Sequence, residues 1–123
     1  MSSQPLDKNL DPSPLVAAIL EKSKAGRLKW EATADENVFI ASVGGNTLKI
    51  YLGTTEGFDE YTGQMEQVNV PVLRLLDDKG RTLWEIWPRQ VKGGFQPLFD
   101  LARRVGNKLD ERMESLIGAL EKL

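Results

Sequence analysis

The chain of 123 residues contains no cysteine and no histidine. The absence of cysteine excludes a disulfide framework and thiol chemistry. The absence of histidine removes the commonest general base, the commonest side-chain metal ligand and the usual pH switch together. The remaining ligands are carboxylates, carbonyls and water, which suit Mg²⁺ or Ca²⁺ only weakly here. We therefore expect no specific metal site, no other cofactor and a non-enzymatic role.

Neither sign of charge is in large excess, because the formal net charge is −2. A chain so balanced has no overall field that would attract nucleic acid or an anionic membrane, so we expect neither as a partner. Basic residues do gather at Lys22, Lys24, Arg27 and Lys29. Cations are favoured at the C-terminal end of a helix, and this explains the cluster without a ligand.

Long hydrophobic runs are also missing. The N-terminus has no apolar core typical of a signal peptide, and no later run approaches the length of a membrane span. A cytoplasmic location is therefore the expectation. The length fits one domain. Residues 1–12 are polar and include two prolines, so we expect a disordered lead-in over 1–12 and a single α+β domain over 13–123.

Apolar periodicity predicts an N-terminal helix, about five antiparallel strands in meander order, and a long C-terminal helix. Ser13 before Pro14 is expected to cap the first helix, and Gly26 to end it. The expected ranges are 14–25 for this helix, 28–33, 38–43, 47–52, 70–76 and 81–87 for the strands, and 97 onward for the last helix.

One long C-terminal helix is expected because its apolar residues keep a spacing of three and four. These residues are Leu98, Leu101, Ala102, Val105, Leu109, Met113, Leu116, Ile117 and Leu120. Gly106-Asn107 lowers the helix propensity without breaking the phase, so we expect a weak point there and not a second helix.

Both helices are expected to pack on one face of the sheet. The residues assigned to that face are Trp30, Phe39, Ala41, Val43, Leu48, Ile50, Leu52, Leu73, Leu75 and Leu83. In the first hairpin, turn chemistry at residues 44–46 and a shared apolar face favour pairing Val43 with Leu48 and Phe39 with Leu52.

The segment Val70–Trp87 is expected to form the central hairpin. Asp77-Asp78-Lys79-Gly80 is typical of a type I turn followed by a G1 bulge. That turn pairs Leu75 with Leu83. On this register the face opposite the helices is also apolar, which is unusual for a sheet with one solvated face.

We expect this second face to bind a protein partner, with Trp84 at its centre. The surrounding residues are Ile40, Tyr51, Val72, Arg74 and Ile86. Exposed apolar patches mark binding sites, and tryptophan beside arginine is typical of interface hot spots. The partner would be a second copy in a homodimer, or another protein to which this chain binds as an adaptor or inhibitor. Coverage of the face by the chain's own loops is the alternative.

Two other functions stay open. Residues 53–67 form a long connection with three glycines and four acids, which could fold back over the body. Tyr51, Phe58 and Tyr61 would then be the walls of a small-ligand pocket. A carboxylate-based enzyme is the third, although the acidic pairs, such as Asp77-Asp78, fall mostly in turns that favour aspartate for backbone reasons.

Three segments together resemble a recurrent type of small bacterial α+β protein. They are KAGRLKWEATADENVFIAS, LRLLDDKGRTLWEI and LFDLARRVGNKLDERMESLIGAL, and the resemblance spans roughly Leu15 to Leu120. It implies a helix, an antiparallel meander and a C-terminal helix, and no activity is assigned to the group. This chain departs from the pattern in its long 53–67 connection.

Overall fold

The computed structural model describes residues 10–123, and over that range the chain folds into three α-helices, one short 3-10 helix and a five-stranded antiparallel sheet. The expected α+β class is confirmed. Of the expected lead-in over 1–12, residues 1–9 lie outside the described residues. The elements are α1 (Ser13–Lys24), β1 (Glu31–Ala32), β2 (Phe39–Val43), β3 (Asn46–Asp59), β4 (Gln64–Leu76), β5 (Thr82–Ile86), η1 (Pro88–Gln90), α2 (Gln96–Gly106) and α3 (Leu109–Glu121).

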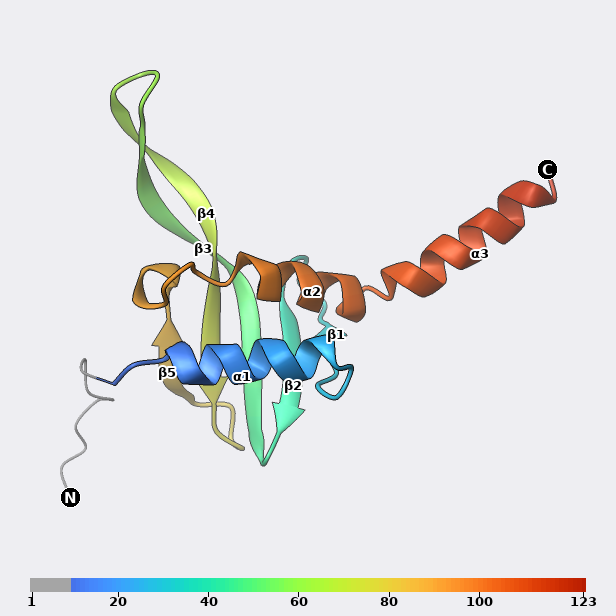
Figure 1. The fold of residues 1–123 in the computed structure, drawn as a ribbon, viewed down its shortest axis with the longest axis horizontal. Coiled ribbons are helices and arrows are strands. Elements are labelled where there is room, and N and C mark those ends of the chain that lie inside the picture. The colour runs from blue at the N-terminus through green and yellow to red at the C-terminus, as the bar shows by residue number, and fades with distance from the viewer. Residues whose placement is uncertain (1–9) are drawn as a thin grey trace.

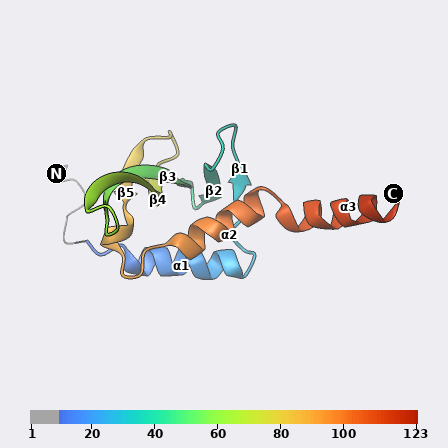
Figure 2. The same cartoon turned by 90° about the horizontal axis from the view of Figure 1, so that it is seen from above.

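The sheet is a meander whose strands pair in the order β1-β2-β3-β4-β5. Helices α1 and α2 lie side by side on one of its faces (Figures 1 and 2). No helix among the described residues is both long and apolar enough to cross a membrane.

The core lies between this face and the two helices, and it contains a pair of packed aromatic rings. Phe39 of β2 meets Phe99 of α2 edge-on, with ring centroids 6.1 Å apart and planes at 67°, which is a favoured aromatic arrangement. The other buried apolar residues of this cluster are Val16, Ile19, Leu28, Trp30, Ala41, Leu48, Ile50, Leu73, Ile86, Val91, Phe95, Leu98 and Ala102. Because Val91 and Phe95 belong to it, the connection from β5 to α2 is anchored in the core.

One buried polar contact joins α1 to Trp30, the residue directly before β1. The Trp30 indole N–H donates to Ser23 Oγ at 2.9 Å, and the Ser23 hydroxyl donates to the Ile19 carbonyl at 2.7 Å. Both side chains are almost fully buried, so each needs this partner.

Each end of α1 has a specific local contact or conformation. The expected side-chain cap from Ser13 is wrong: the Asp11 carboxylate accepts a hydrogen bond from the Ser13 N–H at 2.9 Å instead. The expected stop at Gly26 is confirmed, because this residue has a φ of +72° just after the helix, a conformation that glycine adopts without strain.

The first hairpin is two residues tighter than expected. Val43 pairs with Asn46 and Phe39 with Ile50, because Gly44 and Gly45 alone form the turn, both with positive φ. A shift of two residues keeps the same side chains on the same face, so Phe39, Ala41, Leu48 and Ile50 are buried as expected, whereas Val43 at the end of β2 is exposed.

The prediction of a single long C-terminal helix is wrong. Helix α2 ends at Gly106 and α3 begins at Leu109, and Lys108 between them is left-handed, with φ 53° and ψ 45°. The chain therefore changes direction, and α3 runs away from the body (Figures 1 and 2).

The prediction that residues 53–67 form a long connection between strands is also wrong. Strands β3 and β4 stay paired beyond the ends of the other three strands, from Thr54 opposite Asn69 to Asp59 opposite Gln64. We call residues 54–69 the arm; Figure 1 shows it projecting as a twisted two-stranded ribbon.

Candidate functional site

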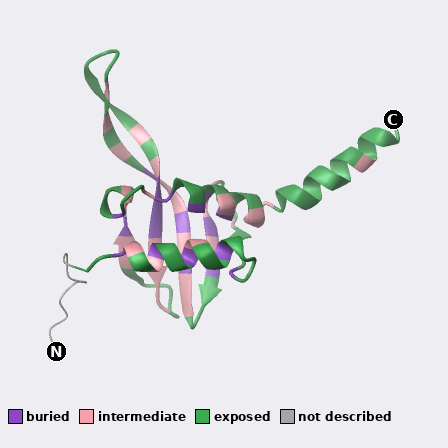
Figure 3. Ribbon diagram, in the orientation of Figure 1, coloured by how far each residue is buried: buried purple, intermediate pink, exposed green. Residues whose placement is uncertain are grey.

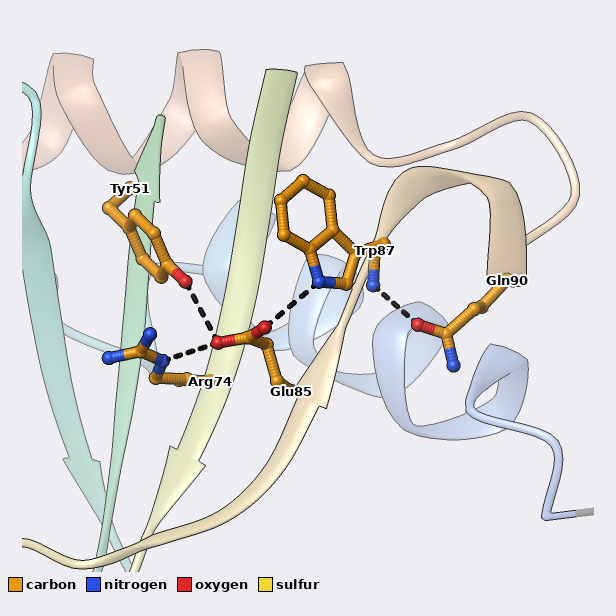
Figure 4. A network of polar contacts seen from close by, with 5 residues as sticks. All are labelled: Tyr51, Arg74, Glu85, Trp87 and Gln90. Carbon is orange, nitrogen blue, oxygen red and sulfur yellow. Dashed lines mark hydrogen bonds and ion pairs between the residues drawn. The ribbon is translucent and has the colours of Figure 1, made fainter. Parts of the chain in front are cut away.

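The face of the sheet opposite α1 and α2 carries a polar network centred on Glu85 (Figure 4). Its Oε2 accepts hydrogen bonds from Arg74 Nε at 2.8 Å and from the Tyr51 hydroxyl at 3.1 Å, and its Oε1 accepts one from Trp87 Nε1 at 2.9 Å. The guanidinium of Arg74 also lies over the Tyr51 ring, 4.9 Å from its centroid, a cation–π distance.

Strands β3, β4 and β5 contribute Tyr51, Arg74 and Glu85, because residues paired across antiparallel strands share a face, and Trp87 follows directly after β5. Arg74 of β4 pairs with Glu85 of β5, and Tyr51 of β3 pairs with Val72 of β4. Opposite charges placed directly across two strands stabilise the pair. The network thus follows from the register of three neighbouring strands.

The network fixes the protonation of its members. The hydrogen bond from Arg74, and then that from Trp87, hold the pKa of the Glu85 carboxyl below its usual value. Partial burial, and then the hydrogen bond to Glu85, raise the pKa of the Tyr51 hydroxyl. At neutral pH the carboxylate is ionised and the phenol is neutral, so the site holds its charges in place and offers no group poised to exchange a proton.

The expected partner surface is placed only in part. Ile40, Tyr51, Val72 and Arg74 do share the face opposite the helices. Trp84, its expected centre, does not: it pairs with Leu75 and packs against the core.

Ile86 is misplaced for the same reason. It pairs with Leu73 and is fully buried in the core. The turn at residues 77–80 forms as expected, with Asp77 N–H bonded to the Arg81 carbonyl at 2.9 Å. A second irregularity follows it: Leu76 pairs with Thr82 but Leu75 with Trp84, which leaves Leu83 as an extra residue. One extra residue turns every later side chain of the strand to the other face.

Trp87 covers part of the second face in place of Trp84. A Cβ at Gly53 would lie 2.7 Å from Val72 Cγ2 and 3.0 Å from Trp87 Cη2, so the indole rests directly on the glycine backbone. Val72 beneath it is fully buried and cannot contact a partner. Glycine in a strand is a signal of such close approach, but the residue that approaches was not evident from the sequence.

The expected pocket beneath residues 53–67 is wrong. Because the segment is an extended ribbon, Tyr61 at its tip is fully exposed and Phe58 is 62% exposed. Tyr51 lies on the sheet within the Glu85 network. These three side chains do not converge on a ligand.

The apolar face of α3 is the feature that the sequence interpretation misplaced. Along α3, which is described in full, no residue is buried (Figure 3). Five large apolar side chains on it are between 42% and 61% exposed. We call them the α3 stripe: Leu109, Met113, Leu116, Ile117 and Leu120. Their helical spacing is typical of a face that packs against something, and the body does not provide it.

An apolar groove of about 420 Å³ lies elsewhere on the body, between α1 and the turn that joins β2 to β3. We call it the α1 groove. It is lined by Leu15, Ala18, Ile19, Lys22, Leu28, Val43, Gly44, Asn46, Leu48 and Leu75. Val43 at its rim is 50% exposed, although it was expected to lie under the helices.

Within residues 10–123, no three acidic side chains converge in a way that could hold a metal ion. Comparisons with protein-family models, curated proteins and solved structures find no significant match to this chain. The resemblance to small bacterial α+β proteins therefore stays a prediction, and the function has to be argued from the surfaces themselves.

Proposed function

We propose that this chain is a non-enzymatic protein-interaction module that binds its partner through the α3 stripe. The observation that carries the proposal is the exposure of five large apolar residues along one face of a helix that extends from the body. Contiguous exposed apolar patches mark interaction sites. An amphipathic helix laid in an apolar groove is a recurrent mode of recognition.

Burial of the α3 stripe would contribute favourably to binding. Each side chain of the stripe is about half exposed, and burying the remainder is worth about 1 kcal/mol per residue, or roughly 5 kcal/mol in all. A helix of 13 residues is also marginal by itself in water, so packing on a partner would stabilise it.

The face opposite α1 and α2 is a second, weaker surface for a protein partner. Ile40, Tyr51 and Arg74 are half-buried there. The carboxylate, phenol and guanidinium already satisfy one another, so a partner gains little by pairing with them. The proposal therefore rests on α3.

The test compares wild type with Leu116→Glu, which places a charge in the middle of the stripe, and with Ser115→Glu, a matched change one residue away. Solution mass by light scattering and capture of partners from a lysate are measured for all three proteins. We expect self-association, or a captured partner, that Leu116→Glu abolishes and Ser115→Glu preserves. If neither association depends on Leu116, the stripe is not an interaction surface and the proposal fails.

A further inference from the structure

The α1 groove and the α3 stripe are two apolar surfaces, each without a partner inside the described body. The groove lies beside α1 at the end of the sheet where β2 turns into β3. The α3 stripe lies on a helix that leaves the body next to the end of α2 (Figures 1 and 2). None of the residues that line the groove comes from α3.

We propose that the α1 groove binds the α3 stripe of a second copy of this chain, in a reciprocal dimer in which each copy donates α3 and accepts that of its partner. This inference rests on the proposed function, because it names the partner of the α3 stripe. A two-fold arrangement closes on itself and is the commonest form of homo-oligomer.

Charge complementarity supports a second copy as the occupant. Helix α3 carries four acids and one arginine, a net charge of −3. Residues 13–30, which form α1 and the segment after it, carry four bases and one acid, a net charge of +3. Lys22 lies in the groove lining itself, and Lys24 follows in the last turn of α1. The basic cluster at this helix end thus gains an acidic counterpart, which steers and orients docking.

The pattern on α3 favours docking on a body over simple pairing of two α3 helices. Leu109, Met113, Leu116 and Leu120 follow a spacing of 4, 3 and 4, as in a coiled coil. Helix α3 nevertheless contains less than two full heptads, whereas a self-sufficient coiled coil usually extends over three or four. A preformed groove supplies the missing surface, and reciprocal docking buries two stripes for a single loss of translational freedom.

The direction of α3 explains why the occupant has to come from another molecule. The left-handed Lys108 turns α3 away from the body, toward the side opposite the N-terminal end of α1 (Figure 1). Val43, Gly44 and Asn46 at the β2–β3 turn line the groove, and this turn lies away from the start of α3 (Figure 1). A second copy can present its α3 there without any change in its own fold.

The experiment uses the full chain in a concentration series by sedimentation equilibrium. Val43→Glu places a charge at the rim of the groove, and Leu116→Glu places one in the stripe. Leu83→Glu is the matched control, since Leu83 is 48% exposed against 50% for Val43 and lies outside both surfaces. We expect a wild-type dimer, a dissociation constant raised at least tenfold in Val43→Glu and in Leu116→Glu, and no change in Leu83→Glu.

Mixing the two defective variants gives the decisive readout. The Val43→Glu copy keeps an intact α3, and the Leu116→Glu copy keeps an intact groove, so an equal mixture can form one of the two contacts. We expect the mixture to contain more dimer than either variant alone at the same total concentration. Circular dichroism verifies folding, and Ala18→Glu, an exposed position of α1 in the groove lining, replaces Val43→Glu if that variant unfolds.

Three results would overturn the inference, and they separate it from the proposed function. If the groove variants remain dimeric while Leu116→Glu is monomeric, α3 pairs with α3; the groove assignment fails and the proposed function stands. If wild type is monomeric throughout the series, the partner is not a second copy, and the lysate capture alone tests the stripe. If Leu116→Glu dimerises as wild type does, α3 is not the contact between copies and the inference fails; the proposed function fails with it only if capture from the lysate is also independent of Leu116.

Discussion

Replacing Gly106 by alanine should destabilise this protein, although the same change stabilises most helices. In an exposed helix interior, glycine to alanine gains about 1 kcal/mol through helix propensity. Here the last residue of α2 lies directly against the sheet. A Cβ at Gly106 would be 2.7 Å from Phe39 Cδ1 and 3.2 Å from the backbone nitrogen of Ala32.

The magnitude follows from what can move. Phe39 is 2% exposed and its ring is packed edge-on against Phe99, so it cannot retreat without disturbing the core. Overpacking of this kind costs about 1–3 kcal/mol, which outweighs the gain in propensity. We expect a net loss of about 1 kcal/mol or more in the free energy of unfolding for Gly106→Ala.

Urea denaturation followed by tryptophan fluorescence measures this loss. With a slope of about 1–3 kcal/mol per molar for small proteins, the midpoint for Gly106→Ala should fall by roughly 0.5 M. Gly118→Ala is the control, because no described atom lies within 4 Å of a Cβ there; it should raise helical content without lowering the midpoint. An unchanged or higher midpoint for Gly106→Ala, at the same slope, would refute the close approach of α2 to the sheet.

Two further predictions concern polar contacts. Ser23→Ala removes the acceptor of the buried Trp30 indole N–H, and it should lower the free energy of unfolding, measured by urea denaturation, by about 1–3 kcal/mol. The same change in a Trp30→Phe background should lower it clearly less. Equal losses in the two backgrounds would mean that the hydrogen bond contributes nothing. Glu85→Gln should cost about 1 kcal/mol or less at pH 7, because the ion pair with Arg74 is partly exposed. The pKa of the Glu85 carboxyl is lowered by folding from a usual value of 4.5, so the pair's contribution is present above that pH and is lost as the pH falls below it. Wild type and Glu85→Gln should therefore converge in stability between pH 4.5 and more acidic values, and a difference that persists into acid would contradict this origin.

The fold class and the strand order could be read from the sequence because they depend on local signals. Alternating apolar residues, the Gly44-Gly45 turn and the Asp77–Gly80 turn mark where strands end. Strands joined by short turns pair with their neighbours in the sequence, which produces a meander. The antiparallel five-stranded sheet follows from these signals.

The orientation of β5 could not be read in this way. The extra residue at Leu83 has no turn residue, glycine or proline beside it to announce a bulge. Its effect is nevertheless complete, since it exchanges Trp84 and Trp87 between the two faces. Tertiary packing decides the matter: Trp84 joins the core, and Trp87 finds a place on Gly53 and a hydrogen bond to Glu85.

The break before α3 was hidden for a different reason. Gly106 was interpreted as a weak point in helix propensity, whereas it is required by contact with Phe39. The chain bends two residues later, at Lys108, where a left-handed conformation is uncommon for lysine. The apolar phase continues through the bend, so periodicity alone predicted one helix on one core.

That continued phase is itself informative. Apolar periodicity indicates that one face of a helix packs against a surface, but it does not indicate whether that surface belongs to the same chain. In α2 the periodic residues Leu98 and Ala102 are fully buried in the body, whereas in α3 Met113 and Leu116 are more than half exposed. Exposure to solvent does not favour a continuous apolar face along α3, whereas burial in an apolar groove would favour it. On the proposal that two copies dock reciprocally, the α3 stripe and the α1 groove complete a shared core, and Val43, exposed at the rim of the α1 groove, is the residue at which that proposal is most directly tested.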